Sequence, residues 1–222
     1  MAKTYLEQSE VEKLEQQASC VRDKLLIRLL SRLGCRVSEA LAIKVEDIDF
    51  KRETVTIQHL KERLRLSCPE CGSRLGRGHR FCPKCGRGVD KPMSKLQQTH
   101  RRRVIPLDSE TLQMLRDFIR RDGTEGLIFG INRHRAWQII RDCARKAGLP
   151  NLVNPETGST KGVSPHRLRD AFAVHAVQID DSGDGLRLLQ EHLGHQSIAT
   201  TMRYRKISGE EHKEWYAKLF RG

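Results

Sequence analysis

Two short segments carry the alternating polar and apolar pattern of β-strands but lie far apart in the chain. Thr54–His59 is one of them, and Arg103–Leu107 is its expected antiparallel partner. Strands paired in this way are commonly joined by a turn of about two to five residues, yet more than forty residues separate these two. The chain therefore has to form a hairpin whose connection is itself a folded insertion.

Within that interval stand two Cys-x-x-Cys pairs, each followed directly by glycine. Cys68 and Cys71 form the first pair, and Cys82 and Cys85 form the second, ten residues further along. Four thiolates from two such turns are the ligand set of a tetrahedral zinc. Because sulfur takes all four positions, the Zn²⁺ is expected to be structural and to stabilise a segment too small for a core of its own. Chance spacing or a redox pair is the alternative.

The charge balance indicates a polyanionic partner. The 222 residues hold 41 Lys and Arg against 28 Asp and Glu, a formal net charge of +13. The positive charge is bunched at Arg101–Arg103 and across Arg116–Arg121, as a surface that follows phosphates requires. Nucleic acid is therefore the expected partner. The zinc segment is expected to add a DNA or protein contact through its own basic residues, which are Arg74, Arg77, His79, Arg80 and Lys84.

The chain shows neither a membrane segment nor a secretory signal. No apolar run is long enough to cross a bilayer, and the start, Met-Ala-Lys-Thr, has no apolar signal region. The protein is thus expected in the cytoplasm, associated with the nucleoid when bound to DNA, and not with a membrane. In a reducing compartment the remaining cysteines, Cys20, Cys35 and Cys143, should be small core hydrophobes.

Most of the remaining chain has helical periodicity. A stripe of five leucines predicts a buried helix over Val21–Leu33. Two short helices are expected to begin at a capping box at Ser9 and at Ser38. A third is expected from Asp108 or Ser109 to Gly123, and a fourth after Asn132, with Trp137 in the core. Two more are expected, one to begin at Ser164-Pro165 and one to run along Leu186, Leu189 and Leu193. Residues 151–163 are expected to form a loop, and residues 180–185 a solvated turn rather than a calcium site.

Four separated motifs carry the candidate catalytic residues. Arg36 follows a glycine at the end of a buried helix, and His166 and Arg169 lie one turn apart at the start of a later helix. His195 follows a glycine that should end another helix, and Tyr204 comes nine residues later on a short capped helix. An arginine, a His-x-x-Arg, a Leu-Gly-His and a tyrosine in this order resemble the catalytic domain of the tyrosine recombinases, the phage-integrase family.

The resemblance implies an α+β, mainly helical fold with a small antiparallel sheet. Residues 1–62 and 92–222 would form the tyrosine-recombinase catalytic domain, and residues 63–91 a four-cysteine zinc ribbon inserted in its β-hairpin. Family members usually carry a separate N-terminal core-binding domain. Only some thirty residues precede Arg36, so no such domain is expected here, and DNA binding is expected to depend on the ribbon.

The resemblance also implies a site-specific recombinase, or integrase, that cleaves and rejoins DNA through a 3′-phosphotyrosine. Arg36 and Arg169 would grip the non-bridging oxygens of the scissile phosphate, where charge builds up in the transition state. His195 would donate a further hydrogen bond, and His166 would accept the phenol proton as Tyr204 attacks. Neither a catalytic metal nor a nucleotide is needed for this chemistry.

In the family, a lysine on the hairpin gives a proton to the leaving deoxyribose oxygen. Counting from Thr54–His59 places Lys61 in that position, whereas counting back from Arg103–Leu107 places Lys95 there. Lys61 is preferred, because strand register is safer from the uninterrupted side. Tyr216 is the rival nucleophile, although its place on an aromatic helix face better fits packing.

Double-stranded DNA is the implied partner, together with self-association as a tetramer on DNA. A terminal helix from Ser208 is expected to dock on a neighbouring protomer through the side chains of Trp215, Tyr216, Leu219 and Phe220. Two other functions stay open. A type IB topoisomerase-like enzyme would nick and reseal without strand exchange, and a non-enzymatic zinc-ribbon DNA-binding protein would form no covalent adduct.

Overall fold

The computed structural model describes residues 3–76, 78–154 and 157–208. Its contacts divide the chain into two compact units. We call Met1–Ile57 with Arg103–Gly222 the helical unit, and Gln58–Arg102 the ribbon unit. The ribbon unit therefore covers the whole interval between the two predicted strands and the last two residues of the first one.

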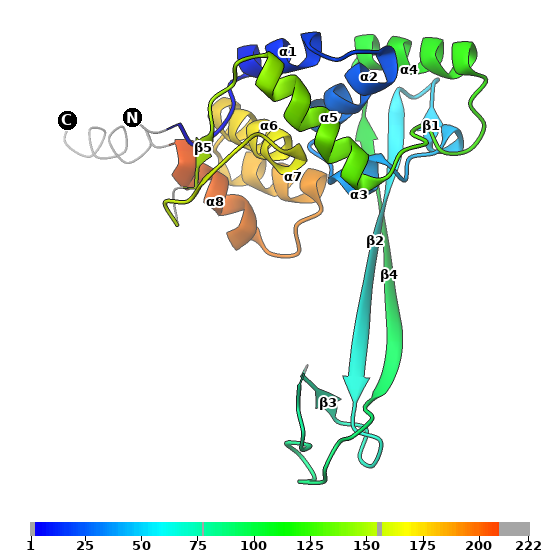
Figure 1. Cartoon of the computed structure of the whole chain (residues 1–222), viewed down its shortest axis with the longest axis vertical. Helices are drawn as coiled ribbons and strands as arrows, with labels where there is room; N and C mark the ends of the chain where they lie inside the picture. Colours follow the sequence, from blue (N-terminus) through cyan, green and yellow to red (C-terminus); the bar gives the residue numbers. More distant parts are fainter. Residues whose placement is uncertain (1–2, 77, 155–156, 209–222) are drawn as a thin grey trace, which may run out of the picture. The chain divides into compact units, whose positions relative to one another are not determined.

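Helix α2 (Val21–Arg32) is the centre of the helical unit (Figure 1). The predicted leucine stripe is confirmed, since Leu25, Leu26 and Leu30 have no exposed surface. Burial of each such side chain is worth about 1.5–3 kcal/mol, so the end of α2 is a rigid position in the fold. The helix contacts α1 (Gln8–Gln16), α3 (Val37–Ala40), α4 (Ser109–Asp122), α5 (Arg133–Lys146) and α6 (Pro165–Ile179).

A second apolar cluster joins α6 to α7 (Gly183–Leu193) and α8 (Ile198–Ser208). Its buried members are Ala173, Val174, Val177, Leu186, Leu189, Leu193 and Tyr204. Two other residues of α6, Leu168 and Ala171, belong to the main core. Helix α6 therefore links the two clusters, and the ring of Tyr204 is fixed by the packing of α8 on α6 and α7.

Several predicted helix ends are confirmed. The side chains of Asp108 and Asn132 each accept a hydrogen bond from the backbone N–H three residues later, at 2.9 and 2.8 Å, and so cap α4 and α5. Gly123 and Gly194 end α4 and α7 in the left-handed conformation. Helix α6 begins with proline directly after Ser164, as predicted.

Two predictions about helices are wrong. Helix α1 begins before Ser9, since Glu7 is its N-cap and donates its backbone N–H to the Glu10 carboxylate at 2.9 Å. Trp137 is 39% exposed, and the Arg141 guanidinium lies 5.0 Å from its ring centroid. The buried face of α5 passes beside the tryptophan, along Ala136, Ile139, Ile140, Cys143 and Ala144.

The predicted loop and the predicted buried cysteines need partial correction. Within residues 151–163, β5 (Leu152–Val153) pairs antiparallel with β6 (Thr160–Lys161). Strands this short show no alternation in a sequence. Cys35 and Cys143 are buried as predicted, whereas Cys20 is exposed.

The predicted hairpin is confirmed and is longer than predicted. Strands β2 (Thr54–Ser67) and β4 (Met93–Pro106) have 14 residues each and run side by side (Figure 1). At one end Leu107 N–H donates to the Glu53 carbonyl at 2.8 Å. At the other, the hydroxyl of the last residue of β2 donates to the carbonyl of the first residue of β4 at 3.4 Å, so the strands are antiparallel. Strands β1 (Ile48–Asp49) and β3 (Arg74–Leu75) also pair with β2.

The ribbon unit rests on two turns of the same build. The N–H of Gly72 donates to the Cys68 carbonyl at 3.0 Å, and that of Gly86 to the Cys82 carbonyl at 2.9 Å. Both glycines have left-handed backbone, with φ of 67° and 71°. Because residues with a Cβ rarely adopt this conformation, the turns explain the glycine after each cysteine pair. The small core of the unit consists of Cys68, Leu75, Cys82 and Val89.

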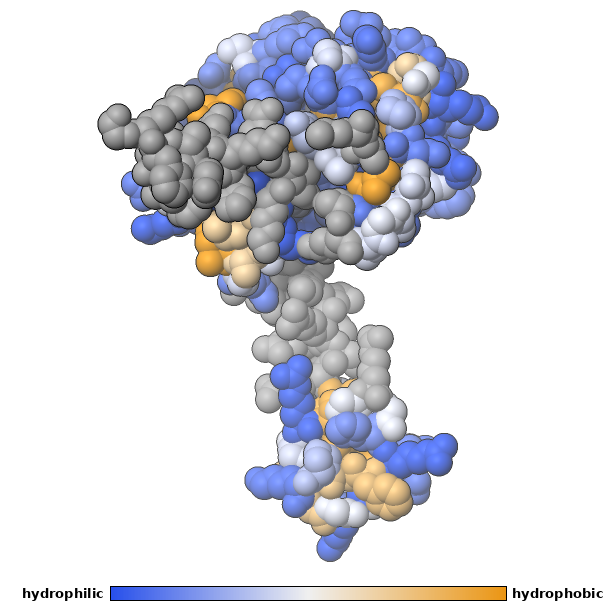
Figure 2. Space-filling view, turned by 90° about the vertical axis from the view of Figure 1, so that its left-hand side faces the viewer, coloured by the Kyte–Doolittle hydropathy of each residue, from blue (hydrophilic) through white to orange (hydrophobic). Residues whose placement is uncertain are grey.

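Figure 2 shows hydrophilic side chains over much of the visible surface of both units, with apolar side chains exposed in places on each. Among the described side chains of the ribbon unit, the large apolar ones that are exposed are Phe81 and Met93, at 68% and 59%. Among the described residues, no helix combines the length and apolar character that a bilayer crossing needs. The predicted terminal helix with Trp215, Tyr216, Leu219 and Phe220 lies outside the described residues.

Candidate active site

Five of the six predicted catalytic residues line one cavity of the helical unit, with a volume of about 950 Å³. They come from three parts of the fold. Arg36 lies between α2 and α3, His166 and Arg169 lie in the first turns of α6, and His195 and Tyr204 lie after α7 and on α8. The fold thus brings together residues that are up to 168 positions apart in the sequence.

Arg36 is held by a buried carboxylate that the sequence analysis did not single out. Its guanidinium donates to Glu39 Oε1 at 2.9 Å, and its backbone N–H donates to Glu39 Oε2 at 2.9 Å. Arg103 donates to the same carboxylate at 2.7 Å, so it does not belong to a simple surface stripe of arginines. The Arg36 side chain stays 39% exposed and lines the cavity. Its spacing from Glu39, three residues, is the one signal that the sequence offered.

Arg169 is fixed between two helix ends. Its guanidinium donates to the carbonyls of Gly34 at 2.7 Å and Leu193 at 2.8 Å, and the residue is 2% exposed. Gly34 has φ +54°, and a Cβ there would come within 2.5 Å of the Phe172 ring. Burial and the neighbouring charge of Arg36 lower the pKa of Arg169. The position of this cation is therefore set before any substrate binds.

The tautomer of His195 follows from its partners. Arg169 NH2 lies 3.0 Å from Nε2, and an arginine can only donate, so Nε2 accepts. Nδ1 then carries the proton and donates to Thr201 Oγ1 at 2.9 Å. Burial and the charges of Arg169 and Arg36 lower the pKa of His195 to about 4, so the ring is neutral near pH 7. Donation from Nε2 to a phosphate, as predicted, needs a proton to move to that atom.

Tyr204 is 7% exposed and contacts the imidazole of His195 and the carboxylate of Asp170. Its ring stacks on that of His195, with centroids 6.1 Å apart and planes 16° apart. Its hydroxyl donates to Asp170 Oδ1 at 3.2 Å. Burial and the negative charge of Asp170 raise the pKa of the phenol to about 12, against the opposing effect of Arg169. The candidate nucleophile is therefore protonated at neutral pH.

His166 also lies near the carboxylate of Asp170. Its Nδ1 lies 3.9 Å from Asp170 Oδ1, and its side chain is 74% exposed. Arg167 also pairs with Asp170, at 3.5 Å. Asp170 was not predicted as a site residue, and its one signal in the sequence is its place one turn after His166.

Lys61 and Lys95, the two candidates for the general acid, lie on the two long strands. Lys61 lies in β2 and Lys95 in β4, in the ribbon unit, and their side chains are outside the described part of the chain. Lys161 of β6, by contrast, lines the cavity. The rival nucleophile Tyr216 lies outside the described residues.

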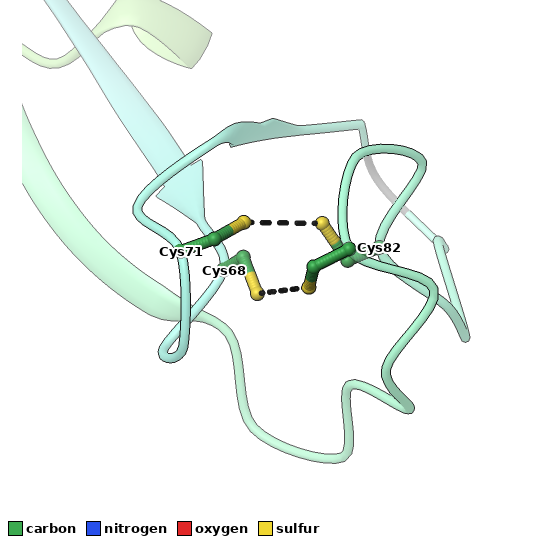
Figure 3. A group of neighbouring side chains, drawn as sticks. Cys68, Cys71 and Cys82 are labelled. Atoms are coloured by element: carbon green, nitrogen blue, oxygen red, sulfur yellow. Dashed lines mark hydrogen bonds between the residues drawn. The ribbon is translucent and has the colours of Figure 1, made fainter.

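Cys68, Cys71 and Cys82 of the ribbon unit point toward one another (Figure 3), and Cys85 belongs to the same cluster. Their sulfurs all lie within 4.8 Å of one another, with Cys71 and Cys82 at 3.6 Å and Cys68 and Cys85 at 3.8 Å. Tetrahedral zinc with Zn–S bonds of about 2.3 Å separates its sulfurs by about 3.8 Å. The donor set and its spacing therefore fit Zn²⁺.

The cavity thus places a buried tyrosine, Tyr204, in one lining with the two arginines Arg36 and Arg169. The model of the phage integrase family matches residues 4–69 and 89–211, and that of a zinc-ribbon domain matches residues 67–89. This chain belongs to the phage integrase family.

Relatives and solved structures agree with this assignment. The chain is 27% identical over 204 residues to the tyrosine recombinase XerA of Pyrococcus furiosus, covering 87% of this chain and 53% of XerA. It is 30% identical over 196 residues to the tyrosine recombinase XerD of Bifidobacterium longum, covering 88% of this chain and 53% of XerD. The chain thus spans about half the length of these curated relatives.

The structural likenesses establish the fold. A crystal structure of XerA recombinase matches with a TM-score of 0.64 and 22% identity over 100% of this chain and 67% of that chain. One of XerH recombinase bound to a palindromic difH substrate, after cleavage, matches with a TM-score of 0.61 and 19% identity over 98% of this chain and 53% of that chain. The predicted fold class, mainly helical with small antiparallel sheets and a zinc-ribbon insertion, is confirmed.

Proposed function

We propose that this chain is a site-specific recombinase that cleaves and rejoins double-stranded DNA through a 3′-phosphotyrosine on Tyr204. The observation that carries the proposal is the cavity in which Arg36, His166, Arg169 and His195 surround the buried hydroxyl of Tyr204. No feature of the cavity favours a type IB topoisomerase-like or a non-enzymatic function over this one.

In the proposed reaction, Tyr204 Oη attacks the scissile phosphorus and the bond to the 5′ oxygen breaks. Arg36 and Arg169 stabilise the charge on the non-bridging oxygens, because planar guanidiniums can donate two parallel hydrogen bonds and stay charged. His195 adds a donor once Nε2 is protonated. The leaving 5′ oxygen takes its proton from a lysine, for which Lys61 is our assignment and Lys95 the alternative.

The experiment that tests this function is covalent trapping on a nicked suicide duplex, from which the short 5′ product diffuses away. The unsubstituted protein should form an adduct, and Tyr204→Phe should form none while binding the duplex equally well. An undiminished adduct in that variant would move the nucleophile to Tyr216. Absence of any adduct with the unsubstituted protein would leave a DNA-binding protein without this chemistry.

We also propose that the cysteine cluster holds a structural Zn²⁺ and that residues 63–91 form the ribbon inserted into the catalytic domain of residues 1–62 and 92–222. The sulfur spacing and the zinc-ribbon match at residues 67–89 support this division. Cys68, Cys71, Cys82 and Cys85 would be the ligands. Because the small core contains two of the cysteines, Cys68 and Cys82, the metal would replace the apolar packing that the unit lacks.

The ribbon unit is proposed to bind the DNA backbone. Its 45 residues hold twelve Lys and Arg against three Asp and Glu, so nine of the thirteen net positive charges of the chain lie in it. Arg74, Arg80, Lys84 and Lys91 are exposed. A tetrathiolate zinc centre would subtract two charges, which leaves the unit strongly basic. A phosphate backbone is the surface that such a unit complements.

Recombination requires protomers to assemble on DNA, and a tetramer joined by the C-terminal helix is our proposal for that assembly. The proposal rests on the sequence of residues 208–220 and on the family to which the chain belongs. A protein with this function would be cytoplasmic and associated with the nucleoid when bound to DNA.

A further inference from the structure

The carboxylate of Asp170 is the group that receives the hydrogen bond of the candidate nucleophile. Tyr204 Oη donates to its Oδ1 at 3.2 Å, and His166 Nδ1 lies 3.9 Å from that same oxygen. The Asp170 side chain is 14% exposed, whereas that of His166 is 74% exposed. Arg167 holds the other oxygen, Oδ2, at 3.5 Å and so orients the carboxylate.

We propose that Asp170 is a catalytic residue of DNA cleavage, whose Oδ1 accepts the phenol proton as Tyr204 attacks the scissile phosphorus. The proposal rests on the proposed function and refines the role assigned to His166. A proton that leaves Oη along its hydrogen bond reaches Asp170 first, because general-base catalysis requires the base within hydrogen-bond reach. His166, whose Nδ1 also faces Oδ1, is then placed to take the proton from the carboxylate.

The step balances without a further reactant. The bond between Tyr204 Oη and phosphorus forms, the bond between phosphorus and the 5′ oxygen breaks, and the electron pair leaves with that oxygen. The phenol proton goes to Asp170 Oδ1, and the 5′ oxygen takes a proton from the lysine assigned as general acid. In rejoining, the 5′ hydroxyl gives its proton back to that lysine and attacks phosphorus, the bond between phosphorus and Tyr204 Oη breaks, and Asp170 returns its proton to Oη.

The groups around Tyr204 explain why its phenol keeps its proton, and is a weak nucleophile, before DNA binds. Burial of the ring and the carboxylate of Asp170 against Oη keep the proton on the phenol, whose pKa is raised to about 12. A bound phosphate would draw the oxygen's electrons toward phosphorus and make its proton more acidic. The other charged and titratable groups that line the cavity with this carboxylate come from every element around it: Cys35 and Arg36 before α3, Arg133 on α5, Lys161 on β6, His166, Arg167 and Arg169 on α6, His195 before α8, and Arg203 and Tyr204 on α8.

The test is single-turnover cleavage of the suicide duplex by the full chain over a range of pH. Asp170→Asn keeps an acceptor for the phenol but takes up no proton, so cleavage should slow by about 10²-fold or more. Its rate should rise about tenfold per pH unit, since only the rare phenolate then attacks. The matched control is Asp181→Asn, which removes a carboxylate paired with Arg205 of α8 at 3.3 Å but away from the phenol; its rate should be unchanged.

A second variant tests proton transfer independently of the fold of the first. Asp170→Ala leaves room for a small carboxylic acid, and added formate should restore cleavage by about tenfold or more, whereas chloride at equal ionic strength should not. Cleavage by Asp170→Asn at an undiminished or higher rate would overturn the proposal, because the carboxylate would then only restrain the phenol. A slow rate with the pH profile of the unsubstituted protein, or no rescue by formate, would reduce Asp170 to a positioning residue. Absence of an adduct with the unsubstituted protein would overturn the proposed function itself.

Discussion

The helical unit and the ribbon unit use charge in opposite ways. The helical unit has 177 residues and a net charge of only +4, and its decisive charges are buried, with Arg169 at 2% and Glu39 at 4% exposure. The ribbon unit has 45 residues and a net charge of +9, and its described arginines and lysines are exposed. A large core can fix buried ions in one geometry, as phosphate chemistry requires. A unit with a core of four residues can only display its charge to solvent, which suits contacts along a DNA backbone.

Removing the zinc ligands should have the largest effect, and it should unfold one unit and not the other. We expect Cys68→Ser with Cys82→Ser to abolish zinc binding and to unfold the ribbon unit, because a structural zinc contributes on the order of 10 kcal/mol to folding. The helical unit should stay folded on its own core. Metal content by mass spectrometry and helix content by circular dichroism measure the two effects, with the exposed Cys20→Ser as control. Unchanged zinc content in the double variant would contradict the ribbon assignment, and loss of all helix would contradict the independence of the units.

The assignment of the general acid can be tested by replacing each candidate lysine. Lys61 belongs to the ribbon unit by its contacts, so we expect Lys61→Ala to slow cleavage by about 10²–10⁴-fold. Lys95→Ala and Lys161→Ala should have far smaller effects, and Lys161 is the informative control because it lines the cavity. A duplex with sulfur in place of the 5′ bridging oxygen has a leaving group that needs no proton, so it should restore cleavage by Lys61→Ala.

Other outcomes of that comparison assign the acid elsewhere. If Lys95→Ala alone lost cleavage, and the duplex with the 5′ bridging sulfur restored it, Lys95 would be the general acid and the strand register counted from β4 would be the right one. The same pattern in Lys161→Ala would place the acid on β6, and the helical unit would then be catalytically complete. Asp170→Asn should stay slow on the sulfur duplex, since it affects the attacking oxygen and not the leaving one.

The sequence predicted the site residues that stand at marked helix boundaries. Arg36, His166 and His195 each follow a glycine or a proline that ends or begins a helix, and those breaks locate them in the fold. Glu39 and Asp170 could not be found in this way. Their importance comes from partners remote in the chain, Arg103 and Tyr204, and an acidic residue inside a helix is too common to indicate such a contact.

The same reasoning explains which parts of the fold were missed. Alternation revealed the hairpin at its helical-unit end, but β4 continues toward the cysteines through residues 97–102, which are all polar and do not alternate. Trp137 has helical spacing with the buried stripe of α5 and still lies beside it, because periodicity locates a face only to within one neighbouring position. The cysteine turns were predictable in detail, since ligand spacing and the glycine requirement are both local.

Charge neutralisation should separate binding from chemistry. We expect the change of Arg74, Arg80, Lys84 and Lys91 to Gln to weaken DNA binding by roughly 10-fold to 100-fold. The slope of log affinity against log salt should fall by up to about 3.6, which is about 0.9 for each phosphate that is no longer neutralised. Cleavage at saturating DNA should be unchanged. Fluorescence anisotropy over a salt series measures the first two quantities.

The matched control for those four ribbon charges is the same number of exposed arginines on the helical unit. These are Arg116, Arg120, Arg121 and Arg145. Their conversion to Gln should lower the salt slope less. An equal loss of affinity in both variants would mean that the DNA footprint covers both units alike, and the contrast in charge between the units would then have no bearing on binding.

The smallest expected effect is the pH dependence of stability that comes from the buried imidazole. The pKa of His195 is about 4 in the folded protein and 6.5 for the free side chain, so the unfolded chain binds its proton more readily. Stability from this group is therefore present above pH 6.5 and is lost as the pH falls toward 4. Full burial would make the loss about 3.4 kcal/mol, and partial exposure reduces it to about 1–2 kcal/mol. His195→Gln should flatten the fall in unfolding free energy over this range relative to the unsubstituted protein, as measured by urea titration, whereas the exposed His175→Gln should not. An unaltered slope in His195→Gln would mean that Arg169 does not hold this ring neutral, and the tautomer assigned to it would fall with that result.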